Sequence, residues 1–254
     1  MRFDVMTLFP ELIDGICSSS IIGRAQENGV IEVRSHDIRD FTLDKHRKVD
    51  DTPYGGGMGM LMTVQPIVDC YKSFKNELSG RTKVIYLSPK GKKFDHGKAL
   101  ELSRYNNIVL LCGHYEGIDA RAEEMIVDEL ISIGDFVLTG GELPAAMIID
   151  AVSRLIPGVL ADSVCYEDES IAGGLLEYPQ YTKPAVYEGR AVPEVLLGGN
   201  HKDIDAWRRK KALEATLRHR PDLLKNNPTL TKSDILYLEQ LKQSERKEEL
   251  KSET

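Results

Sequence analysis

The chain has 254 residues, of which 41% are hydrophobic, and its formal net charge is −7 at pH 7. This length suits one large domain or two smaller ones with a real hydrophobic core, and the apolar runs are too short for a membrane span. Four cysteines without Cys-x-x-Cys spacing argue against a zinc site or a disulfide framework, and the start of the chain lacks a basic leader, so we expect a cytoplasmic protein without membrane contact.

The first 160 residues predict strands and helices in alternation. We expect strands at 2–9, 30–38, 83–87, 107–112 and 130–133. We expect helices after Pro10 and at 63–78, 95–103, 118–127 and 144–155. Strands that are apolar on both faces and alternate with helices indicate a buried parallel sheet, so the predicted fold class is α/β.

Three glycine turns follow the apolar strands, at 87–91 (LSPKG), 113–117 (GHYEG) and 134–141 (GDFVLTGG). In parallel sheets, ligands bind outside the carboxyl ends of the strands, and glycine lets bare backbone groups approach a flat ligand. The last turn places Phe136, Val137 and Leu138 between acidic residues, which predicts a pocket for an uncharged or cationic nucleoside. The alternative interpretation is that these are ordinary tight connections, which also favour glycine.

Other nucleotide and hydrolase motifs do not occur in the chain. It has no G-x-x-x-x-G-K-[ST] phosphate loop, no G-x-S-x-G elbow and no H-E-x-x-H helix. The run from Gly55 to Gly59 superficially suggests a dinucleotide fingerprint, but it follows a polar segment and no apolar strand precedes it. We interpret this run as a substrate loop.

Residues 161–174 are polar, acidic and without periodicity, which predicts a flexible linker between a domain at 1–160 and a small α-helical domain at 175–254. Residues 201–254 carry 13 Lys and Arg residues against 10 Asp and Glu residues. A basic module on an acidic body is a weak indication of a phosphate-bearing partner, although solvated helix faces give the same count.

Eight segments, in this order and spacing, resemble the bacterial tRNA (guanine-N1)-methyltransferase family, TrmD, over nearly the whole chain. They are MRFDVMTLFPE, HRKVDDTPYGGGMGMLM, YLSPKG, LCGHYEGIDAR, ISIGDFVLTGGELPA, SRLIPGVL, LLEYPQYTKP and VPEVLLGGNH. The resemblance implies a methyltransferase of the SPOUT superfamily, with a deep trefoil knot in domain 1–160, a tRNA-binding domain at 175–254, and a homodimer. Sequence patterns alone predict the parallel sheet but no knot.

The resemblance also implies that S-adenosylmethionine is the methyl donor. Its sulfonium cation suits an acidic pocket without a phosphate cradle. Glu177 is implied to come from the partner subunit and to lie near the amine of the donor. The residues implied to bind the donor are Tyr86, Leu87, Ser88, Pro89, Gly113, Tyr115, Glu116, Gly117, Ile133, Gly134, Asp135, Phe136, Val137, Leu138, Gly140, Gly141, Pro144 and Glu177.

The implied substrate is the guanosine at position 37 of tRNA, beside the anticodon. Its ring nitrogen 1 carries a proton at neutral pH, so a base must remove it, and a guanidinium can stabilise the charge that moves to the carbonyl oxygen. The family's arginine for this role matches Arg154. The family's base is an aspartate directly before the linker serine, Ser170, but here Glu169 holds that position; we favour Glu169, with Asp168 as the alternative.

The remaining implied contacts hold the anticodon stem-loop. The residues implied to bind tRNA are His46, Asp50, Tyr54, Gly59 and Ser170. The resemblance also implies a dependence on Mg²⁺, but no carboxylate cluster in the sequence identifies a metal site.

Two other functions fit parts of the sequence. A knotted methyltransferase could act on a different RNA, but the segments LLEYPQYTKP and PYGGG lie outside the shared donor-binding core and disfavour that reading. A non-enzymatic RNA-binding protein could retain the fold, but Arg154 and an acidic residue beside Ser170 argue against the loss of catalysis.

Overall fold

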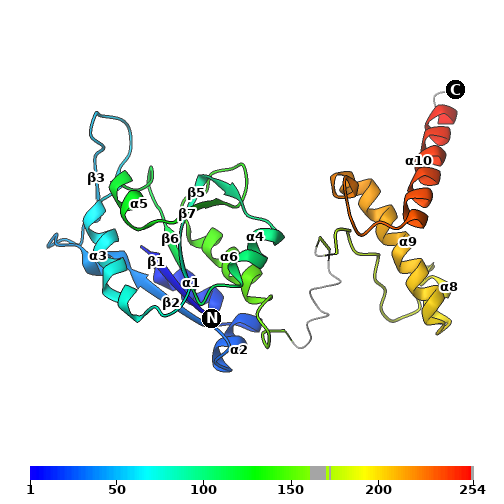
Figure 1. Cartoon of the computed structure of the whole chain (residues 1–254), viewed down its shortest axis with the longest axis horizontal. Coiled ribbons are helices and arrows are strands. Elements are labelled where there is room, and N and C mark those ends of the chain that lie inside the picture. Colours follow the sequence, from blue (N-terminus) through cyan, green and yellow to red (C-terminus); the bar gives the residue numbers. More distant parts are fainter. Residues whose placement is uncertain (161–169, 172, 253–254) are drawn as a thin grey trace. The chain divides into compact units, whose positions relative to one another are not determined.

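The computed structural model describes residues 1–160, 170–171 and 173–252, with side chains as far as residue 244. The chain divides into two compact units, Met1–Ser163 and Val164–Thr254 (Figure 1). The division falls inside segment 161–174, which the sequence predicts to be a linker. Most of that segment lies outside the described residues.

The centre of the first unit is a five-stranded sheet in the order β2-β1-β6-β5-β7 (Figure 1), in which every neighbouring pair is parallel. Its strands are β1 (Arg2–Thr7), β2 (Glu32–Asp37), β5 (Thr82–Lys93), β6 (Asn107–Cys112) and β7 (Glu129–Ser132). Every residue of β6 is buried. The predicted α/β class with a buried parallel sheet is therefore confirmed.

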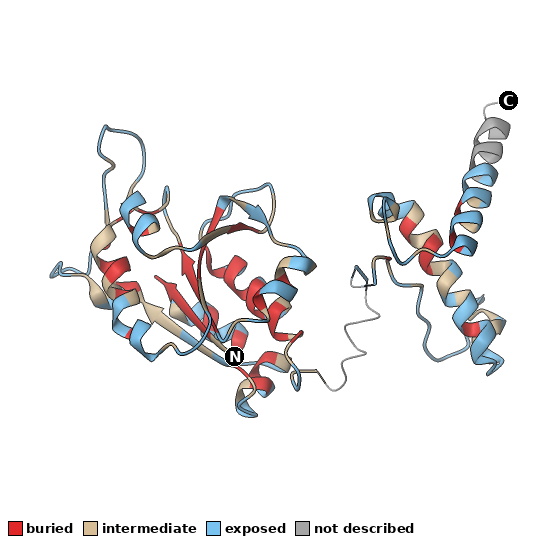
Figure 2. Ribbon diagram, in the orientation of Figure 1, coloured by how far each residue is buried: buried red, intermediate tan, exposed pale blue. Residues whose placement is uncertain are grey.

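Helices connect the strands and cover the sheet. They are α1 (Pro10–Cys17), α2 (Ser20–Glu27), α3 (Val64–Phe74), α4 (His96–Leu102), α5 (Ala120–Ile126) and α6 (Glu142–Ser153), with the 3₁₀ helices η1 (Ile38–Phe41) and η2 (Lys75–Glu77). Buried residues gather on the sheet and on the helix faces turned toward it (Figure 2). Asp95 and Asp119 cap α4 and α5, because each side chain accepts a hydrogen bond from a backbone N–H of the first turn.

Strand β5 differs from its prediction. The sequence predicts that a strand ends at Leu87 and a turn follows, but β5 continues to Lys93 with a register shift against β7 between Leu87 and Lys92. Gly91 makes this possible, because a Cβ there would lie 2.4 Å from the backbone nitrogen of Ile131. The extension is polar and mostly exposed, and its composition is typical of a turn, which is why the sequence predicts a turn there.

The segment between β2 and α3 contains a small hairpin that the sequence analysis did not predict. Its strands are β3 (Asp50–Asp51) and β4 (Leu61–Met62), and they pair antiparallel. The backbone N–H of Met62 donates to Gly117 at 2.9 Å, and the N–H of Glu116 donates to Met60 at 3.0 Å. The hairpin is therefore hydrogen-bonded to the 113–117 turn.

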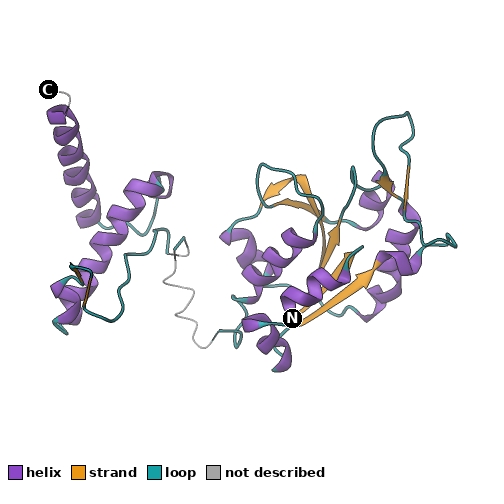
Figure 3. Ribbon diagram, turned by 180° about the vertical axis from the view of Figure 1, so that it is seen from behind, coloured by secondary structure: helices purple, strands orange, loops and turns teal. Residues whose placement is uncertain are grey.

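The second unit is largely helical (Figure 3). It contains α8 (Glu194–Leu197), α9 (His201–His219), η3 (Pro221–Leu224) and α10 (Lys232–Ser252), and the short strands β8 (Val186–Tyr187) and β9 (Arg190–Ala191). Leu175, Ala212, Leu213 and Leu238 form its small core. In the described parts of both units, no helix has the length and apolar character needed to cross a membrane.

Candidate active site

A pocket of about 440 Å³ lies at the carboxyl ends of β6 and β7 and beside residues 86–90 of β5. This volume is in the range of small-molecule sites. Every residue that the resemblance implies for donor binding lines the pocket, except Asp135 and Glu177. The structure thus brings the three predicted glycine turns together around one cavity.

The two exceptions lie elsewhere. The carboxylate of Asp135 is 80% exposed and forms an ion pair with Lys93 at the end of β5. Glu177 belongs to the second unit, where its backbone N–H donates to the hydroxyl of Ser170 at 2.9 Å. The roles of both residues remain predictions.

The pocket also contains residues that the sequence analysis missed. They are Leu61, Lys90, His114, Ile118, Glu123, Ile131, Ser132 and Thr139. His114 lies inside the GHYEG turn, and this place in a predicted pocket turn was the one feature of the sequence that could have identified it. Leu61 reaches the pocket because the hairpin is hydrogen-bonded to that turn, which no local pattern reveals.

Three glycines allow the turns to pack against one another. A Cβ on Gly141 would lie 2.6 Å from the Cα of Cys112, and one on Gly113 would lie 2.9 Å from the hydroxyl of Tyr86. A Cβ on Gly140 would lie 2.3 Å from the ring of His114. The N–H of Gly141 donates to the carbonyl of Gly113 at 3.1 Å, so the two turns are joined directly.

The charges around the pocket favour a cationic ligand over a phosphate. Glu116 and Glu123 are the acidic residues among those that line it, and Lys90 is its lysine. A polyphosphate would need several cations or a cluster of free backbone N–H groups. The balance of charges in the pocket therefore agrees with the prediction from the sequence of a site for an uncharged or cationic nucleoside.

The thiol beneath the pocket is inert at neutral pH. Cys112 is completely buried, and desolvation raises the pKa of its thiol well above the usual value. Burial also raises the pKa of Tyr86, whose phenol therefore stays protonated. Neither group supplies an anionic nucleophile, which suits a direct displacement without a covalent enzyme intermediate.

Arg154 lies at the opposite end of α6 from the pocket. The helix begins at the pocket, where Pro144 contributes to the lining, and Arg154 caps its C-terminus. Ten residues of helix separate them by about 15 Å along the axis. The other predicted catalytic residues, Asp168 and Glu169, lie outside the described residues.

The residues predicted to contact tRNA fall in two places. Tyr54 is fully exposed in the loop of the β3–β4 hairpin, Asp50 begins β3, and His46 lies on the segment that leads into the hairpin. Gly59 lies against the donor-binding turn, since a Cβ there would be 2.4 Å from Cγ of Glu116. Ser170 belongs to the second unit.

We assign no magnesium site. The described residues contain no group of three or more His, Cys, Asp or Glu side chains that could hold a metal ion. No step proposed below uses Mg²⁺.

The parallel α/β sheet and the glycine-lined pocket at its carboxyl edge are typical of nucleoside-binding enzymes. The profile of the family described as tRNA (Guanine-1)-methyltransferase TrmD matches residues 1–226. A protein of Alkaliphilus oremlandii named tRNA (guanine-N(1)-)-methyltransferase is 57% identical over 95% of this chain and 99% of its own length. A protein of the same name from Ruminiclostridium cellulolyticum is 56% identical over 90% of this chain and 98% of its own length. The chain therefore belongs to the TrmD family of tRNA (guanine-1)-methyltransferases, as its sequence segments predict.

Proposed function

We propose that this protein transfers a methyl group from S-adenosylmethionine to nitrogen 1 of the guanosine at position 37 of tRNA. The observation that carries the proposal is the pocket, because all the donor-binding residues implied by family resemblance line it, apart from Asp135 and Glu177. The proposal includes the deep trefoil knot in the domain that holds this pocket, and a cytoplasmic location.

The chemistry of the pocket fits this donor. S-adenosylmethionine supplies an electrophilic methyl group on a sulfonium cation. Glycines at 113, 140 and 141 let the turns pack closely around a cavity that suits an adenosine moiety, and Glu116 and Glu123 balance the positive charge. Calorimetric titration of the purified protein with S-adenosylmethionine should show saturable binding. If no binding occurs with or without tRNA, the assignment of the pocket is wrong.

Two groups prepare the guanine for attack. A carboxylate removes the proton from nitrogen 1, and we favour Glu169 over Asp168 for this role because it directly precedes Ser170. The guanidinium of Arg154 stabilises the negative charge that moves to the carbonyl oxygen. Holding the two reactants in line supplies much of the remaining acceleration.

The choice of base is open to a direct comparison. Glu169→Gln and Asp168→Asn each remove one carboxylate with little change in shape. We expect Glu169→Gln to lower kcat by about 10²–10⁴-fold and Asp168→Asn to change it little. Single-turnover methyl transfer to unmodified tRNA measures both, and the reverse ranking would assign the base to Asp168.

We also propose that the protein works as a homodimer, which would bring Arg154 of one copy to the pocket of the other. Four large apolar side chains are about half exposed on two helices in contact, Leu12 and Ile16 on α1 and Leu143 and Met147 on α6. Each pair has i, i+4 spacing, so its members lie on one face of the helix. Such a patch suits a self-complementary interface. A two-fold axis at this patch would place the C-terminus of α6 in one copy, with Arg154, near the N-terminus of α6 in the other copy, which adjoins the pocket.

A charge in this patch tests the dimer. Met147→Glu would place a carboxylate at the centre of the proposed interface, where burial without a partner is unfavourable. We expect analytical ultracentrifugation to show a shift from dimer to monomer, with loss of methyl transfer. Lys72→Glu on the exposed face of α3 is the matched control and should stay dimeric. A wild-type protein that sediments as a monomer at micromolar concentration would contradict the proposal.

tRNA has two candidate contact regions, and we propose that both are used. The β3–β4 hairpin presents Tyr54, and the second unit presents Trp207 beside Tyr178, with Arg208 over the Tyr178 ring at 5.1 Å. Aromatic and guanidinium groups of this kind stack on bases and contact phosphates.

A further inference from the structure

We propose that His114, held by the buried carboxylate of Glu142, is a positioning residue that sets the affinity of the pocket for the methyl donor. The inference rests on the proposed function, because it explains how the pocket keeps its shape. His114 follows β6 and lines the pocket, while Glu142 begins α6 and is only 3% exposed. Neither residue has a part in the proton transfer described above.

The carboxylate of Glu142 receives hydrogen bonds from two directions. Nε2 of His114 lies 2.9 and 2.8 Å from its two oxygens, and the hydroxyl of Thr7 donates to one of them at 2.5 Å. A ring nitrogen between two carboxylate oxygens carries the hydrogen, so Nε2 is the donor. Burial alone raises the pKa of Glu142, but these hydrogen bonds hold it below its usual value, and the group is ionised at neutral pH.

The pair lies where two pocket turns meet. His114 and Gly140 form an antiparallel bridge between the 113–117 and 134–141 turns, and the imidazole covers the Cα of Gly140 so closely that a Cβ would be 2.3 Å from the ring. Both turns line the pocket. The imidazole is therefore fixed at its far side by Glu142, and the glycine turn is packed against it. Loss of either partner frees the imidazole that packs against Gly140, and only the backbone contacts between the two turns remain.

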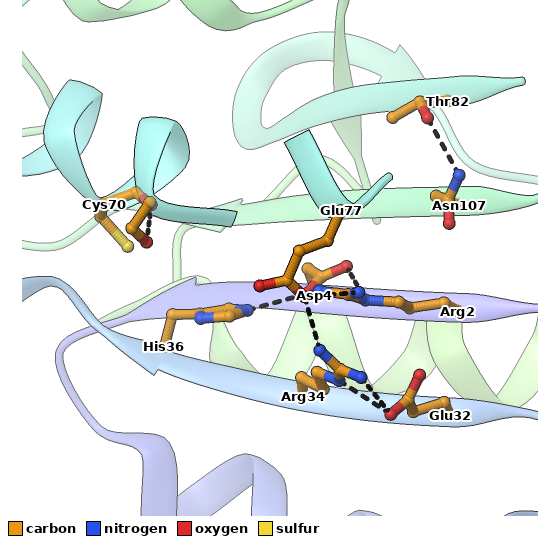
Figure 4. Close-up of polar contacts among 10 residues, drawn as sticks. Arg2, Asp4, Glu32, Arg34, His36, Cys70, Glu77, Thr82 and Asn107 are labelled. Carbon is orange, nitrogen blue, oxygen red and sulfur yellow. Dashed lines mark hydrogen bonds and ion pairs between the residues drawn. The ribbon is translucent and has the colours of Figure 1, made fainter. Parts of the chain in front are cut away.

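The chain contains a matched pair with no connection to the pocket. Nε2 of His36 lies 2.8 Å from Oδ1 of Asp4, which is fully buried and also binds the guanidinium of Arg2 (Figure 4). This pair joins β1 to β2, while the pocket is lined by the middle of β5 and by the residues that follow β6 and β7. Breaking either pair should lower the stability of the protein, but only the loss of the His114–Glu142 pair should change the affinity for the methyl donor.

The experiment compares full-length His114→Ala, His114→Gln, Thr7→Val and His36→Ala. For each protein, calorimetry gives the Kd for S-adenosylmethionine, steady-state assays give kcat and the KM for tRNA, and thermal unfolding gives Tm. We expect His114→Ala to raise the donor Kd about tenfold or more, because it leaves a buried carboxylate without its main partner. At saturating donor, kcat should change less than about threefold, since no transition-state contact is removed.

The other variants separate positioning from stability. His114→Gln keeps an N–H donor that can reach Glu142, so it should restore most of the affinity. Thr7→Val should raise the Kd by a smaller factor, about threefold, because His114 still binds the carboxylate. His36→Ala should lower Tm at least as much as His114→Ala and leave the donor Kd unchanged.

Three results would overturn the inference: a wild-type Kd in His114→Ala, an equal loss of affinity in His36→Ala, or a fall in kcat larger than the rise in Kd. If His114→Ala does not fold, His114→Gln and Thr7→Val still decide, because a donor Kd unchanged by Thr7→Val is also contrary to the inference. Failure of the wild-type protein to bind the donor is a different outcome, since it would refute the proposed function itself.

Discussion

Replacement of Arg154 by alanine should lower kcat by about 10²–10³-fold, because it removes the guanidinium that we propose stabilises the developing charge on the guanine oxygen. The donor Kd should stay within about twofold of the wild-type value, since the contact proposed for Arg154 is with the guanine and not with the methyl donor. Calorimetry and single-turnover methyl transfer measure the two quantities separately. This division between binding and turnover is what distinguishes a catalytic role from a structural one.

Arg154→Lys is the matched variant for this test. Lysine keeps the positive charge but lacks the planar fork of donors, so we expect it to recover only part of the lost rate. A strong loss of donor binding or of Tm in Arg154→Ala would show instead that the arginine stabilises the end of α6.

Replacement of Gly141 by alanine should weaken donor binding by more than about 100-fold, because the added methyl group has no room. Its Cβ would lie 2.6 Å from the Cα of Cys112, and backbone atoms in a buried strand cannot move aside as a flexible side chain can. The glycine turn would have to separate from β6, and its hydrogen bond to Gly113 would break. Calorimetry with S-adenosylmethionine measures the loss.

Gly198→Ala controls for the substitution itself. Gly198 has a negative φ of −80°, and the nearest atom to a Cβ there is 3.8 Å away, so alanine fits without strain. This variant should bind the donor as the wild-type protein does. A Gly141→Ala protein with normal donor affinity would mean that the turn does not form the wall of the donor site.

The two inactive variants can also be combined. In a mixed dimer of one Arg154→Ala chain and one Gly141→Ala chain, the intact pocket belongs to the first chain and the intact arginine to the second. If Arg154 acts on the pocket of the other copy, mixing should restore activity at one of the two sites. If mixed dimers form but remain inactive, Arg154 must act within its own chain.

Much of the fold was predictable from local patterns. Residues 108–112 are an unbroken apolar run, and β6 contains all of them because both of its faces are buried. The end of β5 was not predictable, since the stretch from Lys90 to Lys93 is as polar as a turn and is held in the strand only by pairing with β7. The β3–β4 hairpin escaped prediction for a related reason, because strands of two residues have no periodicity.

The site was predictable to a similar extent. The three glycine turns indicated a pocket, since each follows an apolar strand of a parallel sheet. The pairing of Glu142 with His114 and Thr7 was not predictable, because these residues lie 28 and 135 positions from Glu142 and a single histidine in a turn has no pattern. The catalytic assignment of Arg154 came from family resemblance alone.

The proposed function is tested most directly by mapping the methyl group on the product. Unmodified tRNA with guanosine at position 37 is incubated with the protein and labelled S-adenosylmethionine, and the modified nucleoside is identified by nuclease digestion and mass spectrometry. The proposed function predicts N1-methylguanosine at position 37, and no incorporation when adenosine replaces that guanosine. Methylation at another position, or an equal yield from the adenosine-substituted tRNA, would contradict it.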